Sequence, residues 1–140
     1  MSGIVVGVDD SPSSKHALRW AVEEARLRKA ELHVVSAWEF PFAQPTSPDD
    51  DPLPGVPSLE QTALAELGTA VSEAGGDPAD PAVITEIVHG SPARVLIEAA
   101  QGADLLVVGS RGRGGFSGLV LGSVGRQVIN HAPCPVVVVR

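Results

Sequence analysis

The sequence predicts an α/β protein in which five parallel strands form one open, doubly wound sheet with four helices on its two faces. Five short apolar runs rich in β-branched residues alternate with stretches of helical periodicity, and this alternation implies crossover connections between parallel strands. The runs are nearly continuous, as is typical of strands buried on both faces. They occupy residues 4–8, 32–38, 82–88, 105–108 and 136–139.

The first helix is predicted between the first two runs. Ser11 supplies a hydroxyl that can cap the helix, and Pro12 follows at a position where its missing N–H does no harm. The apolar residues after it recur every three or four positions, which favours a helix with one face on the sheet. They are Ala17, Leu18, Ala21, Val22 and Ala25.

The second helix precedes the third run. Ser58 and Gln61 have the spacing of a capping box, so they mark its start. Gly75 and Gly76 lie where a helix ends in a left-handed residue. The apolar positions between these signals have helical spacing and are Leu64, Leu67 and Val71.

The third and fourth helices follow the third and fourth runs. Ser91 and Pro92 repeat the cap arrangement of the first helix, and Gly102 is placed to end the third. The fourth helix follows a glycine-rich segment and leads to the last run. The apolar positions of these helices are Val95, Leu96 and Ala99 in the third and Val124, Val128 and Ile129 in the fourth.

Residues 39–57 do not fit the alternation of strands and helices. This segment contains six prolines and three consecutive aspartates, a composition that favours a mobile surface loop. It is too short and too central for a convincing domain linker, and the sequence has no obvious internal repeat. We therefore expect residues 1–140 to form a single domain.

Charge and hydropathy exclude several classes of function. The protein has 17 acidic and 10 basic residues, so its overall field repels nucleic acids and acidic membranes. No apolar run approaches the roughly 20 residues of a membrane-spanning helix. The amino terminus lacks the basic and apolar segments of a secretion signal, so we expect a cytoplasmic protein.

The cysteine and histidines give no sign of a metal site. Cys134 is the only cysteine and lies between two prolines, which favours a buried small apolar residue. The histidines have no metal-ligand spacing with one another or with this cysteine, so we expect surface or cap residues and no structural metal. They are His16, His33, His89 and His131.

The segment 109–123 follows the fourth run and contains six glycines. Glycines allow main-chain amides to approach an anion, and the start of the next helix adds free N–H groups and a favourable dipole. Ser110, Ser123, Arg111 and Arg113 can add hydroxyl and cationic contacts. A flexible surface loop would also be rich in glycine. The position decides for a phosphate site, because ligands of open parallel sheets bind beyond the carboxyl ends of the strands.

Two common nucleotide motifs are absent. The only lysines, Lys15 and Lys29, do not follow the glycine frame of a Walker A loop. A dinucleotide fingerprint would place its glycines after the first strand, where this sequence has Asp9, Asp10 and Ser11. A nicotinamide cofactor is therefore not expected.

The spacing of the glycines resembles a known signature. Gly109-x-x-Gly112, nine residues and then Gly122-Ser123 is similar to the ATP-binding signature of the universal stress protein family. The resemblance extends over nearly the whole sequence, with residues 39–57 standing apart. It implies the strand order 3-2-1-4-5, in which Asp9 at the end of the first strand faces the glycine loop.

The resemblance also implies a set of residues that bind ATP. Asp9 would contact the nucleoside, and Ala37 at the end of the second strand would line the adenine pocket. Without the glycine signature, Asp9 would read as a helix-capping or loop-solvating acid. Magnesium would bind through the phosphates rather than in a cage made by the protein. Residues around the ribose and phosphates would be Gly109, Gly112, Gly122 and Ser123, with Val8, Ser110, Arg111 and Val124 as neighbours.

The sequence and the family resemblance also lead to expectations about the oligomeric state and the function. In the implied order, residues 136–139 form an apolar edge strand, and family members commonly pair through it, so a homodimer is expected. The favoured function is an ATP-dependent regulatory module of the stress response, sensed by an unknown protein partner. The alternatives are a slow ATPase or autophosphorylating enzyme, against which the lack of an evident base argues, and an interaction dimer that binds no nucleotide.

Overall fold

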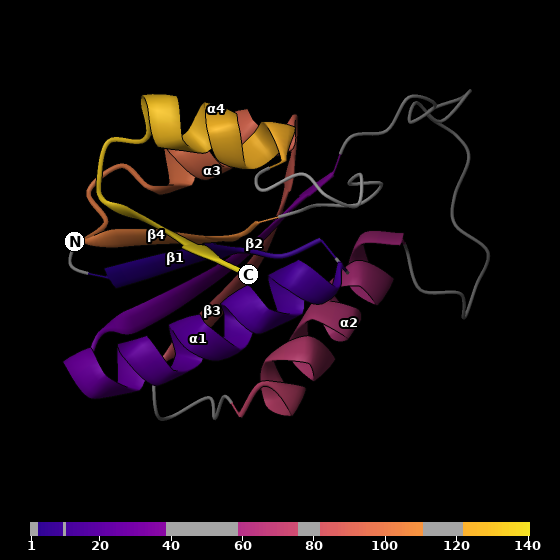
Figure 1. Cartoon of the computed structure of the whole chain (residues 1–140). Helices are drawn as coiled ribbons and strands as arrows, with labels where there is room; N and C mark the ends of the chain where they lie inside the picture. The colour runs from indigo at the N-terminus through magenta and orange to yellow at the C-terminus, as the bar shows by residue number, and fades with distance from the viewer. Residues whose placement is uncertain (1–2, 10, 39–58, 76–81, 111–121) are drawn as a thin grey trace, which may run out of the picture.

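The computed structural model describes residues 3–9, 11–38, 59–75, 82–110 and 122–140. Within these ranges strands and helices alternate along the sequence, and each predicted element is present (Figure 1). The strands match the predicted runs to within one residue at either end. Residues 39–57, Ser58 and Gly76 lie outside the described residues. The elements are β1 (Gly3–Gly7), α1 (Pro12–Arg28), β2 (Glu31–Trp38), α2 (Leu59–Glu73), β3 (Val83–His89), α3 (Pro92–Ala99), β4 (Leu105–Gly109), α4 (Ser123–His131) and β5 (Val136–Val139).

The strands form one parallel sheet in the order β3-β2-β1-β4-β5, which confirms the expected order. β1 is central, since Ile4 is paired with Leu32 on one side and with Leu105 on the other. The polypeptide winds from β1 towards β3 and then returns to β4, so its direction reverses between β1 and β4. The carboxyl ends of these two strands are therefore neighbours.

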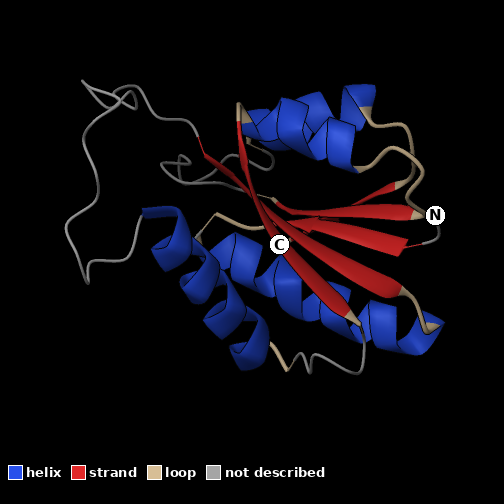
Figure 2. Cartoon of the chain, turned by 180° about the vertical axis from the view of Figure 1, so that it is seen from behind, coloured by secondary structure: helices blue, strands red, loops and turns tan. Residues whose placement is uncertain are grey.

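The helices cover both faces of the sheet (Figure 2), and alternate strand residues pack against two different pairs of helices. Ile4 and Val6 of β1 pack in a core with α1 and α2, whereas Val5 packs in a second core with α3 and α4. All three are at most 1% exposed. This burial on both faces is the reason that the strands read as continuous apolar runs.

The ends of the helices confirm several of the predicted signals, but Ser91, the N-cap of α3, makes no side-chain cap hydrogen bond. Ser11 caps α1, and its Oγ accepts a hydrogen bond of 3.1 Å from the Ser14 N–H. Gly75 and Gly102 have φ values of 90° and 79°, as expected for left-handed residues after helices. Lys29, which the sequence did not single out, ends α1 in the same way with φ 53°.

Some predicted core positions are only partly covered. On α2, Leu67 and Val71 are buried, but Leu64 is 37% exposed. On α4, Val128 faces the sheet and is fully buried, so its neighbour Ile129 points away and is 48% exposed. None of the helices in the described ranges is long and apolar enough to cross a membrane.

Cys134 packs against the core of α3 and α4 but is only partly buried, less than the sequence predicted. Burial raises the pKa of its thiol, and the negative charge of Asp104 raises it further. The thiolate is the reactive form, so this environment makes Cys134 less reactive than an exposed cysteine.

We therefore expect the native protein to react with iodoacetamide at pH 8 more slowly than the urea-unfolded protein does, because less of the Cys134 thiol is ionised. The rate should continue to rise as the pH is raised beyond the pKa of an ordinary cysteine. Asp104→Asn should lower this pKa and speed the reaction. Mass spectrometry of quenched samples measures the rate, and equal rates for native and unfolded protein would contradict the assignment.

Candidate functional site

The candidate site lies where β1 and β4 end side by side. Their pairing joins Ile4 to Leu105 and continues as far as Val6 and Val107. Each strand then runs on towards the carboxyl edge of the sheet, where the first leads into α1 and the second into the segment before α4. Continuing the register by three residues would set Asp9 opposite Ser110. The topology therefore brings together two segments that are far apart in the sequence.

Asp9 is tied to the start of α1. Its Oδ1 accepts hydrogen bonds from the Ser11 N–H at 3.0 Å and from the Ser11 Oγ–H at 2.5 Å. Its own N–H donates to Ser14 Oγ at 3.1 Å. The turn after β1 is thus fixed by three hydrogen bonds, in which Asp9 binds the N-cap residue Ser11 and does not itself cap the helix amides. These contacts also hold its half-buried carboxylate at the edge of the sheet.

Ser110 is the first residue after β4 and is 6% exposed. Its N–H donates to the carbonyl of Val139 at the end of β5, and its carbonyl accepts from the Gly122 N–H, both at 2.8 Å. The two ends of the glycine-rich segment are thereby held together. Arg111 and Gly112, which the sequence assigned to the site, lie outside the described residues.

The start of α4 is the part of the site best suited to an anion. Gly122 is the N-cap, and its carbonyl accepts the N–H of Arg126 at 3.0 Å. The N–H groups of Ser123, Val124 and Gly125 belong to the first turn, where a helix has no main-chain acceptors for them. The helix dipole adds a partial positive charge at the same place. Through the Gly122–Ser110 hydrogen bond, this helix end lies at the end of β4.

Gly109 has a structural role that the sequence did not reveal. A Cβ at this position would lie 2.5 Å from Ser13 Oγ and 2.7 Å from the backbone carbonyl carbon of Ser13. Glycine therefore allows the first turn of α1 to pack directly on the end of β4. By contrast, Gly122 has φ −74°, which any residue can adopt, so its backbone conformation does not require glycine.

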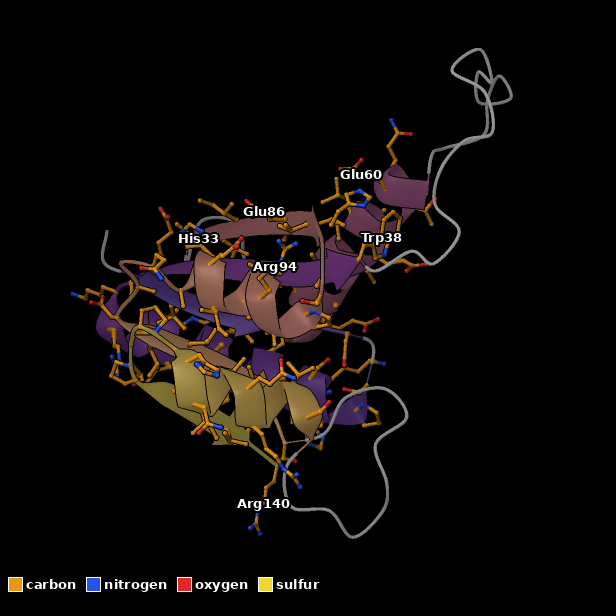
Figure 3. All side chains as sticks on the ribbon, turned by 90° about the horizontal axis from the view of Figure 1, so that it is seen from above. His33, Trp38, Glu60, Glu86, Arg94 and Arg140 are labelled. Carbon is orange, nitrogen blue, oxygen red and sulfur yellow. The ribbon has the colours of Figure 1, made fainter. Side chains whose placement is uncertain are left out.

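Ser13 joins the two segments, and sequence reasoning missed it. Its Oγ lies 3.4 Å from Ser110 Oγ and 3.4 Å from the carbonyl oxygen of Val139. The signal was present as three serines within four residues after the first strand, because helix starts after parallel strands lie at the carboxyl edge of the sheet. Nearby, His16 Nδ1 lies 3.3 Å from the carbonyl oxygen of Arg140, whose side chain extends outward (Figure 3).

The remaining predicted residues lie along the same edge but on different faces. Ala37 is half-buried and packs on the α3 and α4 side of the sheet. Val8 is 7% exposed in the core under α1 and α2, and its N–H donates to Val35. A ligand at the edge would therefore meet Val8 through its backbone. Trp38, after Ala37, forms an edge-to-face contact with His89 (centroids 5.9 Å apart).

The chemistry that this edge offers is binding through main-chain amides and hydroxyls. No group of three or more His, Cys, Asp or Glu side chains that could hold a metal is found in the described part of the protein. Amide donors at a helix start suit the oxygens of a phosphate, and a carboxylate such as that of Asp9 suits the hydroxyls or amino group of a nucleoside.

The model of the universal stress protein family matches residues 1–140. The chain belongs to the universal stress protein family. A universal stress protein of Mycobacterium tuberculosis is 37% identical over 139 residues, which is 98% of this chain and 44% of that protein. The chain therefore spans less than half the length of this curated relative. These matches confirm the resemblance seen in the sequence.

Solved structures of universal stress proteins have the same fold. The UspA protein of Lactobacillus plantarum is 25% identical, with a TM-score of 0.68 and coverage of 99% of this chain and 97% of that one. A universal stress protein crystallised in complex with cAMP is 29% identical, with a TM-score of 0.69 and coverage of 99% and 96%. The five-stranded Rossmann-like sheet is thus shared with these family members.

The contact between Gly109 and Ser13 makes a prediction about stability. Gly109→Ala should lower the free energy of unfolding by about 1–3 kcal/mol, because the added methyl overlaps backbone atoms of α1. Gly68→Ala is the matched control: a Cβ there would meet no atom within 4 Å apart from the backbone of its own helix, and alanine should stabilise α2 by about 1 kcal/mol. Urea denaturation measures both. An equally stable Gly109→Ala variant would show that the close approach is absent.

Proposed function

We propose that this protein binds an adenine nucleotide at the edge described above, that the ligand is ATP, and that the protein acts as a nucleotide-dependent regulatory module in a stress response. The observation that carries the proposal is the hydrogen bond between Gly122 and Ser110, which sets the open start of α4 at the end of β4, beside the segment of Asp9. The cAMP complex of a 29% identical family member supports an adenine nucleotide as the ligand class.

In this proposal each part of the ligand meets a different strand end. The base lies towards Ala37 at the end of β2, and the nucleoside contacts Asp9. The phosphates bind the amides of Ser123 and Val124, whose helix start has the matching partial charge. Magnesium arrives with the phosphates. The other proposed contacts are Val8, Gly109, Ser110 and Gly122, together with Arg111 and Gly112.

The proposal also covers assembly and location. β5 is an edge strand, and the side chains of Val136 to Val139 are half-buried in the single protomer, so pairing with a second copy would cover them. We therefore propose a homodimer through β5, and sedimentation that shows only monomer at micromolar concentration would exclude it. A cytoplasmic location, where ATP is abundant, and an unknown protein partner complete the proposal.

Titration calorimetry on nucleotide-free protein tests the binding site. ATP with magnesium should bind, and Asp9→Asn should weaken binding about tenfold, because it replaces a charge-assisted hydrogen bond by a neutral one. The asparagine Oδ1 can still accept from Ser11, so the turn should persist. Asp104→Asn is the matched control, since this exposed aspartate precedes β4 at the opposite edge of the sheet.

Two results would contradict the proposal. The first is no binding of any adenine nucleotide to the wild-type protein, together with no nucleotide detected by mass spectrometry in the protein as purified. The second is equal weakening by Asp9→Asn and Asp104→Asn. Persistent dimers without nucleotide binding would instead identify an interaction dimer.

Turnover distinguishes the regulatory module from an enzyme. Autophosphorylation would need a serine hydroxyl near the phosphates, and Ser110 is the described candidate at the end of β4. It is 6% exposed and 3.4 Å from Ser13 Oγ, so it is poorly placed to attack a bound phosphate. We expect phosphate release by the wild-type protein to equal that of Gly122→Val. Steady release above this control would assign a slow ATPase.

A further inference from the structure

The two halves of the candidate site meet where the start of α1 packs on the end of β4. One half is the end of β1 and the start of α1, with Asp9, and the other is the end of β4 and the start of α4, with Ser110 and Gly122. Backbone pairing between β1 and β4 ends at Val6 and Val107, three residues before Asp9 and Ser110. Beyond that point, the relative position of the halves depends on how the start of α1 meets the end of β4.

Ser13 lies at this junction. Its backbone packs on Gly109, and its Oγ lies 3.4 Å from Ser110 Oγ. The same oxygen is 3.4 Å from the Val139 carbonyl, which also accepts the Ser110 N–H at 2.8 Å. A single serine of α1 therefore contacts Ser110 through its hydroxyl and shares a carbonyl acceptor with the Ser110 amide.

The donors and acceptors of this group are mutually consistent. Each serine has one O–H to donate, so Ser110 can donate to Ser13 while Ser13 donates to Val139. Both oxygen separations of 3.4 Å exceed those of typical O–H···O hydrogen bonds, so the link is weak at this geometry. Such contacts are often long without ligand and shorten when a ligand is bound.

The contacts from Ser13 to Ser110 connect two groups that the proposed ligand would contact, the start of α4 and Asp9. From Ser110, the carbonyl holds the Gly122 N–H and thereby the start of α4. On the other side, Ser13 is in the same helical turn as Ser14, whose Oγ accepts the Asp9 N–H. A shift of α1 relative to Ser110 would therefore change the separation between Asp9 and the phosphate-binding amides.

We propose that Ser13 is a positioning residue of the nucleotide site, whose hydroxyl sets the distance between the Asp9 segment and the start of α4 by linking α1 to Ser110 and to the end of β5. The inference rests on the proposed function. It also links the site to the β5 edge, because the carbonyl that Ser13 approaches belongs to the last residue of that strand.

Loss of a positioning residue should lower the affinity for the ligand, whereas loss of a structural residue should lower the free energy of unfolding. Ser13→Ala keeps the backbone packing on Gly109 and removes only the hydroxyl. The sheet pairing and both cores are made by other residues, so the free energy of unfolding without nucleotide should change little. Affinity should fall, because the two groups of ligand contacts would no longer be held at a fixed separation.

The experiment compares three variants by calorimetric titration with magnesium ATP and by urea denaturation without nucleotide. Ser13→Ala should weaken binding about fivefold, the effect of one neutral hydrogen bond. Ser13→Thr keeps the hydroxyl and should bind within about twofold of wild type. Ser72→Ala removes an exposed serine of α2 and serves as the matched control, with unchanged affinity.

Wild-type affinity in Ser13→Ala, or failure of Ser13→Thr to restore it in a protein of unchanged stability, would overturn the inference. If the wild-type protein binds no adenine nucleotide, the proposed function fails. Amide hydrogen exchange then tests separately whether Ser13 links α1 to Ser110. In that case the Ser110 N–H should exchange faster in Ser13→Ala than in wild type and Ser72→Ala. Equal exchange in all three would overturn the linkage as well.

Discussion

The burial of β1 between two paired neighbours and under helices on both faces is the constraint on which the rest of the structure depends. Ile4, Val5 and Val6 are at most 1% exposed, and each is paired with both β2 and β4. The polypeptide leaves β1 for α1 on one face and leaves β4 for α4 on the other. Consequently two helix starts lie beside adjacent strand ends, at the place where open parallel sheets bind their ligands.

Close approach of the helices to the sheet is possible because glycine ends both of the central strands. A Cβ on Gly7 would lie 2.7 Å from Leu96 Cδ1 on α3, and one on Gly109 would overlap Ser13 on α1. These two glycines face different helices on opposite sides of the sheet. Of the two, Gly109 bears on the candidate site, because it lets the start of α1 lie directly against the end of β4 beside Ser110.

The strands and helices were predictable because burial on both faces of the sheet requires continuous apolar runs, which are visible in the sequence. Contacts between elements that are distant in the sequence produce no such pattern. The strand order came from family resemblance, since five valine-rich runs do not reveal which of them pair. The glycine at 109 was recognised but its packing on Ser13 was not, because that contact joins residues 96 positions apart. For the same reason Ser13 itself was missed, although Ser11 was identified from its local cap signal.

The structure shows that Gly109 and Gly122 of the signature are not equally good evidence for a ligand. Gly109 would be needed for the packing of α1 even in a protein that binds nothing, so its presence does not by itself indicate nucleotide. Gly122 has an ordinary backbone conformation, and glycine is only slightly less favourable at an N-cap than serine or asparagine. Neither its backbone conformation nor its N-cap position requires glycine. Of these two positions, Gly122 is therefore the better one at which a substitution can test the proposed binding, since Gly109 is needed for the packing of α1.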